Sequence, residues 1–110
     1  MYHSRLNDIE DIKSIHWESD AVYHLFVVRV DPEIRNQLRE LLGLRGIQTG
    51  IHYPLTIPEQ EAFSPWKTIC PIAKKASREI LSLPLDPLMT HEEVDYICNV
   101  LIESLNDLKV

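Results

Sequence analysis

The segment that begins at Thr90 carries the pattern that restricts the fold of this chain most strongly. Thr90 and Glu93 have the spacing of a capping box, in which each side chain satisfies an amide group at the start of a helix. Behind them, apolar residues recur at helical spacing: Val94, Ile97, Cys98, Leu101, Ile102, Leu105 and Leu108. A helix with one continuous apolar face must bury that face, so the sequence predicts a helix packed against another layer of structure.

Three further segments predict strands. Residues 23–30 are rich in β-branched and aromatic residues and are apolar on both faces in their middle, which predicts a central strand buried on both sides. Residues 81–85 alternate along the chain and predict a short strand. Pro84 places that end at a sheet edge or a strand end, because proline cannot donate to a sheet. Residues 46–54 predict a third, short strand that runs into a loop.

Two more helices are expected. In the first, Asp31 is a suitable N-cap, Pro32 suits the first helical position and Glu33 complements the positive end of the helix. Its apolar positions are Ile34, Leu38, Leu41 and Leu42. Either Gly43 or Gly46 can adopt the left-handed conformation that ends a helix.

The second of these helices begins at Pro71. The spacing predicts a buried apolar face made of Ile72, Ala73, Ala76 and Ile80. The opposite, solvent-exposed face is expected to hold Lys74, Lys75, Arg78 and Glu79. Together the strands and helices predict an α+β fold, in which a small sheet packs against helices.

The chain is expected to divide into two regions. Residues 1–20 form a polar lead-in, which is either the end of a helix or a segment that packs on something outside this chain. Residues 21–110 form the folded domain. Within that domain, residues 54–71 hold four of the seven prolines and predict an irregular surface loop, a kind of segment that often carries function.

Composition favours one soluble domain in the cytoplasm. A formal net charge of −6 without a basic stripe argues against nucleic acid or anionic lipid as the main partner. The longest apolar run, Leu25 to Val28, is too short to span a membrane, and the N-terminus lacks the apolar core of a signal peptide. Cys70 and Cys98 have no Cys-x-x-Cys spacing, so two reduced thiols are expected and no metal site is predicted.

His52 and Tyr53 are the most suggestive candidates for a functional site, because they stand where a predicted strand meets the proline-rich loop. An imidazole and a phenol there could bind a ligand or relay protons; a turn-stabilising histidine and a packed tyrosine are the alternative. His91 lacks a second histidine one turn later and is not expected to bind metal, and His24 is expected to be a sheet residue. The residues alone predict no catalytic group.

Four segments, in their order and spacing, resemble the C-terminal region of the DegT/DnrJ/StrS family of sugar aminotransferases: residues 24–30, 46–54, 80–85 and 87–94. The most specific pair is Gly-Ile-Gln-Thr-Gly-Ile-His-Tyr-Pro at 46–54 and Leu-Ser-Leu-Pro at 81–84. The resemblance covers roughly residue 21 to the C-terminus. It implies the small C-terminal domain of fold-type I enzymes that use pyridoxal phosphate and act on nucleotide-linked keto-sugars.

The resemblance also implies site residues. His52 matches the family histidine that lies near the cofactor and the sugar, so His52, and less strongly Tyr53, are expected to bind substrate. The loop then departs from the family pattern His-Tyr-Pro-x-Pro-x-His-x-Gln. Thr56 stands for the second proline and Pro58 for the second histidine, while Gln60 matches. Lys74 stands where the family has a glutamate.

The resemblance does not extend to the residues that perform transamination. The family's Schiff-base lysine and its other cofactor contacts lie in a large domain to which no part of this chain corresponds, so no catalytic residue is expected here. Pyridoxal phosphate is implied for the intact enzyme and not for this chain alone. The implied partners are that large domain, the nucleotide-sugar and a second copy in a homodimer. The alternative is a stand-alone binding or regulatory module without enzymatic activity.

Overall fold

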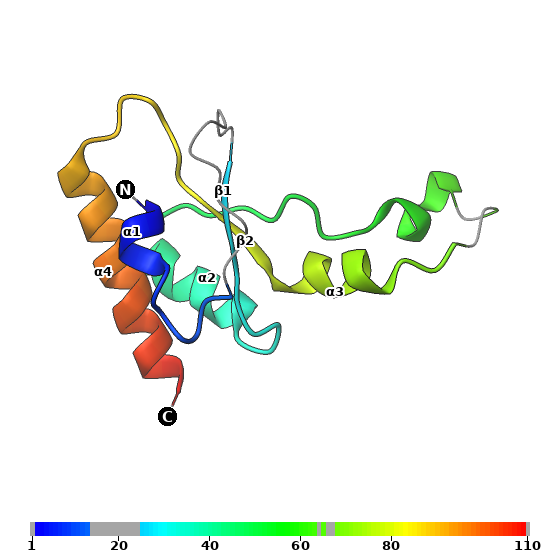
Figure 1. Ribbon diagram of the computed structural model, residues 1–110, viewed down its shortest axis with the longest axis horizontal. Coiled ribbons are helices and arrows are strands. Elements are labelled where there is room, and N and C mark those ends of the chain that lie inside the picture. The colour runs from blue at the N-terminus through cyan, green and yellow to red at the C-terminus, as the bar shows by residue number, and fades with distance from the viewer. Residues whose placement is uncertain (1, 14–24, 64, 66–67, 110) are drawn as a thin grey trace.

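Two antiparallel strands and four α-helices make up the part of the chain that the computed structural model describes, residues 2–13, 25–63, 65 and 68–109. In order they are α1 (Tyr2–Leu6), β1 (Phe26–Arg29), α2 (Arg35–Leu44), the 3-10 turns η1 (Ile57–Glu59) and η2 (Glu61–Phe63), α3 (Pro71–Glu79), β2 (Ile80–Leu83) and α4 (His91–Leu108). The strands lie in the middle, with α1 and α4 on one side and α3 leading away on the other (Figure 1). The predicted α+β class is confirmed.

The strand β2 is the inner strand of the described sheet. It pairs antiparallel with β1, with Phe26 opposite Leu83 at one end. On its other edge, Gly50 and Ser82 form a single bridge in which the amide of each donates to the carbonyl of the other, at 3.1 and 2.8 Å. The strand predicted over 46–54 is therefore reduced to one bridge. The chain bends away after it, towards Pro54, which has no amide to extend the pairing.

The strand β1 is more exposed than its sequence predicts. Val28 is the buried residue of its four, and the remaining three are half-buried. Its outer edge is met by one bridge, from Lys13 to Arg29, so among the described residues β1 is not the central strand. The first residues of the predicted strand, Tyr23 and His24, lie outside the described residues.

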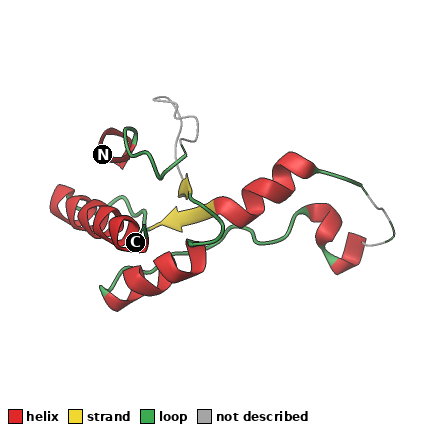
Figure 2. Cartoon of the chain, turned by 90° about the horizontal axis from the view of Figure 1, so that it is seen from below, coloured by secondary structure: helices red, strands yellow, loops and turns green. Residues whose placement is uncertain are grey.

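The core forms around α4, as its pattern predicted. The buried side chains of α4 include Val94, Ile97, Cys98, Leu101 and Leu105. They cluster with Val28, Leu81 and Leu83 of the strands and with Leu38 and Leu42 of α2. At the start of α4 the amide of Glu93 donates to the hydroxyl oxygen of Thr90 at 3.1 Å, which confirms the capping box. In Figure 2 the helices α1, α2 and α4 lie on the side of the strands away from α3, which extends in the other direction.

The helix α2 begins later than its sequence predicts. Its first residue is Arg35, not Pro32. The carboxylate of Asp31 accepts a hydrogen bond from the amide of Glu33 at 2.9 Å and so closes a turn ahead of the helix instead of capping it. At the other end Gly46 has a φ of +81°, the left-handed conformation expected of a glycine after a helix.

The helix α3 begins at Pro71 as predicted, and Lys74, Lys75 and Arg78 are exposed as predicted, but the two faces are not divided as the spacing predicts. Ile72 is 85% exposed, whereas Glu79, predicted to face solvent, is only 1% exposed. The reason is that α3 leaves the core, and its C-terminal end is the part that adjoins the strands (Figure 1). Glu79 is buried there because it forms salt bridges to Arg29 and Lys13, and a buried carboxylate needs such partners.

The start of the chain packs against the core. Tyr2 and Leu6 are buried on α1, and the ring of Tyr2 stacks on Phe26 with centroids 4.8 Å apart. The hydroxyl of Tyr2 donates to the carbonyl of Pro84 at 2.6 Å, and burial raises its pKa well above the usual range. The expected boundary between residues 20 and 21 lies outside the described residues.

Residues 53–63, 65 and 68–72, which include η1, η2 and the first turn of α3, extend from the sheet to one side of the molecule and are called the arm below (Figure 1). The core beside them holds α1, α2, α4 and both strands. The molecule is accordingly elongated, with principal extents of 48 × 38 × 24 Å.

Candidate functional site at the base of the arm

His52 and Tyr53 lie where the chain leaves the sheet and enters the arm. Their rings meet edge to face, with centroids 5.5 Å apart, and the peptide bond between them is cis. Both side chains are exposed, Tyr53 to 70%. The structure therefore places the two predicted site residues together and accessible, and the alternative of a packed tyrosine does not hold.

The imidazole of His52 is anchored on β2. Its Nδ1 lies 2.9 Å from the hydroxyl oxygen of Ser82, which is itself only 5% exposed. In a strand, successive side chains point to opposite faces, so Ser82 lies on the face opposite to Leu81 and Leu83. Sequence reasoning missed Ser82, although a lone hydroxyl between two core leucines was a signal that could have found it.

Gly50 leaves the space that the imidazole occupies. A Cβ added to Gly50 would lie 2.7 Å from Cε1 of His52, which is closer than a side-chain carbon can approach. Thr49, the residue before Gly50, is also held in place. Arg39 of α2 donates from Nε to the hydroxyl of Thr49 at 3.1 Å and from Nη2 to the carbonyl of Thr49 at 3.2 Å. The segment that delivers His52 is thus held from α2 and from β2.

The loop after His52 has its own fixed turn. The amide and the hydroxyl of Thr56 both donate to the carboxylate of Glu59, at 3.2 and 2.9 Å. These hydrogen bonds hold the pKa of Glu59 below its usual value. Arg78 of α3 lies 3.7 Å from the same carboxylate, which links the loop to the helix.

The three residues that depart from the family pattern line one pocket. Its volume is about 290 Å³, and its lining residues are Thr56, Pro58, Glu59, Thr68, Ile69, Cys70, Pro71 and Lys74. The structure therefore brings Thr56 and Pro58 of the arm together with Lys74 of α3, which lies 16 residues further along the chain than Pro58. No spacing rule indicated this before the fold was known.

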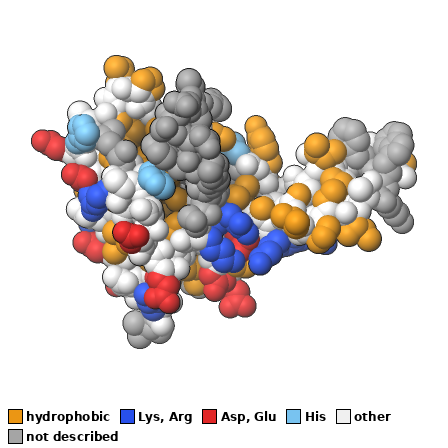
Figure 3. All heavy atoms as spheres, in the orientation of Figure 1, with side chains coloured by type: hydrophobic (Ala, Val, Ile, Leu, Met, Phe, Trp, Pro, Cys, Tyr) orange, Lys and Arg blue, Asp and Glu red, His pale blue; other side chains and the backbone are white. Residues whose placement is uncertain are grey.

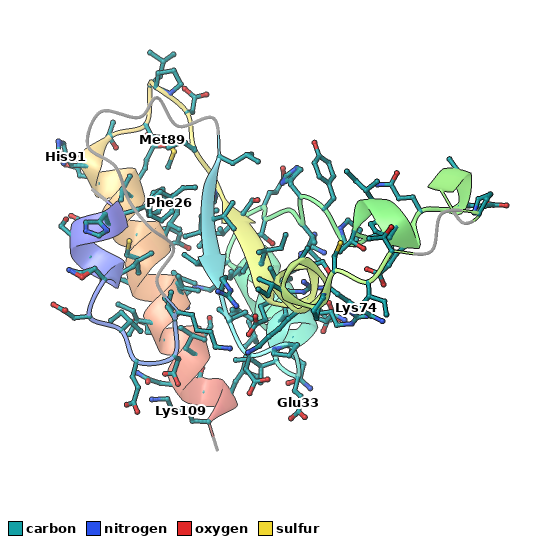
Figure 4. The ribbon with its side chains drawn as sticks, turned by 45° about the vertical axis from the view of Figure 1, so that its right-hand side comes forward. Phe26, Glu33, Lys74, Met89, His91 and Lys109 are labelled. Carbon is teal, nitrogen blue, oxygen red and sulfur yellow. The ribbon has the colours of Figure 1, made fainter. Side chains whose placement is uncertain are left out.

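None of the described lysines lies in a site that suits a Schiff base. Such a lysine needs a pocket that lowers its pKa so that the amine is free to react. Lys13 is bound to Glu79, and Asp11 raises the pKa of Lys109. Lys74 and Lys75 are exposed on α3, and Figure 4 shows Lys74 and Lys109 on separate parts of the molecule. Among the described lysines, none is therefore placed to hold pyridoxal phosphate as a Schiff base.

The remaining candidates for a functional site are metal ligands and His91. The described residues contain no group of three histidine, cysteine or acidic side chains that could hold a metal ion. His91 is an exposed residue at the start of α4, and Figure 4 shows it at the end of the molecule away from the arm. Among the described helices, none has the length and apolar character that crossing a membrane requires.

Comparison with known proteins gives a family match. Residues 1–102 match the model of the DegT/DnrJ/EryC1/StrS aminotransferase family. A curated relative, the dTDP-3-amino-3,6-dideoxy-alpha-D-galactopyranose transaminase of Aneurinibacillus thermoaerophilus, is 40% identical over 86 residues, which cover 77% of this chain and 22% of the relative. The UDP-2-acetamido-2-deoxy-3-oxo-D-glucuronate aminotransferase of Pseudomonas aeruginosa is 31% identical over 81 residues, or 74% of this chain and 22% of that one.

Solved structures give the same result for the fold. S. venezuelae DesV, in complex with a ketimine intermediate, matches with a TM-score of 0.81 and 31% identity, over 93% of this chain and 28% of that one. NtdA of Bacillus subtilis, with bound cofactor PMP, matches with a TM-score of 0.84 and 26% identity, over 96% of this chain and 26% of that one. The matched part of the chain corresponds to between 22% and 28% of the length of these four proteins.

Proposed function

The chain belongs to the DegT/DnrJ/EryC1/StrS aminotransferase family, and on this premise we propose that it is the C-terminal domain of a pyridoxal-phosphate enzyme that aminates a nucleotide-linked keto-sugar. The names of the curated relatives, which are transaminases of nucleotide-linked sugars, support this substrate class. Pyridoxal phosphate supplies an electron sink for such a reaction when bound. In this proposal the cofactor is held by a part of the enzyme outside this chain.

The proposed role of this chain is to contribute to the sugar pocket. His52 and Tyr53 are exposed side by side, and a hydrogen bond to the hydroxyl of Ser82 holds the imidazole of His52. A fixed imidazole can hydrogen-bond a sugar hydroxyl, and the adjacent phenol ring offers an apolar face with a polar tip. The pair thus binds and orients substrate, and the chemical step itself takes place outside this chain.

The observation that carries the proposal is the apolar surface of the arm next to His52. Tyr53, Leu55, Ile57, Ile69 and Ile72 are between 50% and 89% exposed. Apolar side chains gather along the arm in Figure 3. A surface of this kind marks an interface, and we propose that the large domain of the enzyme covers it and so encloses His52.

Two further properties belong to the proposal. The free thiols of Cys70 and Cys98 are compatible with a reducing cytoplasm, which is where we place the enzyme. We also propose that the intact enzyme is a homodimer, as the family resemblance implies.

The proposal is tested by replacing His52 in the full-length gene product loaded with pyridoxal phosphate. In an assay with a nucleotide-linked keto-sugar, we expect His52→Ala to raise KM for the sugar by about ten-fold, which corresponds to one hydrogen bond of about 1.4 kcal/mol. His91→Ala is the matched control, because His91 is exposed and lies away from the arm. An unchanged KM in His52→Ala, or an equal change in the control, would refute the role of His52.

A further inference from the structure

We propose that Ser82 is a positioning residue that fixes the imidazole of His52 with the proton on Nε2, as an outward hydrogen-bond donor. The hydroxyl of Ser82 lies 2.9 Å from Nδ1 of His52. Ser82 is almost fully buried while His52 is exposed, so the sheet holds the Nδ1 side of a ring that remains accessible to solvent.

The hydrogen-bond partners of Ser82 determine which of the two groups, its hydroxyl or Nδ1 of His52, is the donor. The backbone amide and carbonyl of Ser82 are both used in the bridge to Gly50. Among the described residues, Nδ1 of His52 is the partner that remains for the hydroxyl. If Nδ1 carried the proton, the hydroxyl would only accept, and its own hydrogen would be buried without an acceptor. A buried unsatisfied donor costs about 1–3 kcal/mol, so the hydroxyl donates to Nδ1 and the proton of the neutral ring lies on Nε2.

Gly50 makes this arrangement possible. The imidazole occupies the space where a side chain at Gly50 would begin, since a Cβ there would lie 2.7 Å from Cε1 and 3.4 Å from Nδ1 of His52. The ring therefore lies in space that the missing side chain of Gly50 leaves open, and the hydroxyl of Ser82 holds its Nδ1. Two residues that are far apart in the sequence thus fix one ring.

The consequence for recognition is that Nε2 presents a proton and takes an oxygen acceptor. A sugar hydroxyl, a keto oxygen or a phosphate oxygen would accept this bond, whereas an ammonium group would be refused. That consequence rests on the proposed function, because it assumes that a substrate faces His52. The hydrogen bond between Ser82 and His52 does not depend on it.

The test is a ¹⁵N NMR spectrum of the histidine rings in the free 110-residue chain at alkaline pH, where imidazole is neutral. The ¹⁵N resonances of protonated and unprotonated ring nitrogens are well separated in such spectra. We expect the proton of His52 on Nε2, with Nδ1 shifted by the hydrogen bond. Ser82→Ala should remove that shift and bring in the form protonated at Nδ1, while Ser82→Thr, which keeps the hydroxyl, should restore the native spectrum. Ser104→Ala, at another buried serine, is the control and should change nothing at His52.

A proton on Nδ1 in the native chain, or a His52 spectrum unchanged in Ser82→Ala, would overturn the proposal. If Ser82→Ala does not fold, Gly50→Ala tests the proposal instead, because its Cβ displaces the imidazole of His52 without removing the hydroxyl of Ser82. It should also abolish the Nδ1 shift, and an unchanged Nδ1 resonance in that variant counts against the proposal. Neither substrate nor cofactor is present, so a failure here leaves the proposed function standing, and a failure of the assay on His52 leaves this hydrogen bond standing.

Discussion

The carboxylate of Glu79 lies 2.6 Å from Nη2 of Arg29, which joins the last residue of α3 to the last residue of β1. A second contact, from Lys13, brings the N-terminal segment to the same carboxylate. The carbonyl of Glu79 also accepts from the amide of Val30 at 2.9 Å. Three parts of the chain that are distant in sequence therefore meet at one buried residue, directly before the strand that holds Ser82.

Glu79→Gln is expected to destabilise the fold by about 1–3 kcal/mol. The variant keeps the shape of the side chain but leaves Arg29 and Lys13 without a charged partner, and hydrogen bonds to charged groups contribute more than neutral ones. Both cations are partly exposed, which limits the loss. Urea unfolding of the native chain and of Glu79→Gln measures the difference in their free energies of unfolding. Glu103→Gln, which removes an exposed ion pair with Arg45, is the control and should have little effect. Equal unfolding midpoints for Glu79→Gln and the native chain would contradict this role of Glu79.

The same cluster predicts how stability depends on pH. Hydrogen bonds from Lys13 and Arg29 lower the pKa of Glu79 from 4.5 to about 2. Because the folded-state pKa lies below the unfolded one, the stabilisation is fully present above pH 4.5 and is lost as the pH falls from 4.5 through about 2. We expect the difference in stability between the native chain and Glu79→Gln to shrink over that window. A difference that stays constant between about pH 5 and about pH 2 would rule out this linkage.

Thr90→Ala is expected to cost about 1 kcal/mol of stability. The hydroxyl oxygen of Thr90 accepts from the amide of Glu93 at 3.1 Å, and loss of such a cap leaves an end amide without a partner in the protein. Thr90→Ser should retain most of the stability, because it keeps the hydroxyl. Thermal unfolding followed by circular dichroism distinguishes the three proteins, and a serine variant as unstable as the alanine variant would argue against the cap.

The sequence predicted best those elements whose signals are local. The capping box of Thr90 and Glu93 and the start of α3 at Pro71 are confirmed, because caps and helix-start prolines act within a few residues of the chain. The same is true of the end of β2 before Pro84. The position of His52 beside Tyr53 at the loop was also predicted from local sequence.

Predictions from the sequence were wrong or incomplete at residues whose burial and partners depend on tertiary contacts. Glu79 was predicted to face solvent, since its partners Lys13 and Arg29 lie in other parts of the chain. Ile72 was predicted to lie in the core because helical spacing indicates an apolar face but not what covers it. Ser82 could not be paired with His52 before the bridge to Gly50 was known, because that bridge joins residues far apart in the chain.

The arm is expected to bind apolar probes in the isolated chain. Ile69 and Ile72 are 89% and 85% exposed on it. The variant Ile69→Ser/Ile72→Ser should lose most of the binding of a hydrophobic dye and most of the concentration-dependent self-association seen by sedimentation. Leu88→Ser is the matched control, because Leu88 is 88% exposed but lies between β2 and α4. A native chain that stays monomeric and binds no dye would contradict the interface.

The isolated chain is expected to form no specific Schiff base with pyridoxal phosphate. The described lysines are either paired with acidic residues or exposed on α3, so none lies in the kind of enclosed pocket that favours the reaction. Borohydride reduction followed by peptide mapping should give weak labelling spread over several lysines. A single lysine labelled at stoichiometric yield would show that the chain holds a cofactor site of its own.

Whether this chain works as one domain of a larger aminotransferase is decided by the size of the native gene product. A blot of source-cell extract with an antibody to the domain measures it. We predict a band several times larger than 12.8 kDa, since the matched region makes up 22% of the curated transaminase from A. thermoaerophilus. A band at 12.8 kDa would show that the cell makes the domain alone, and a stand-alone binding module would then replace the proposed enzyme.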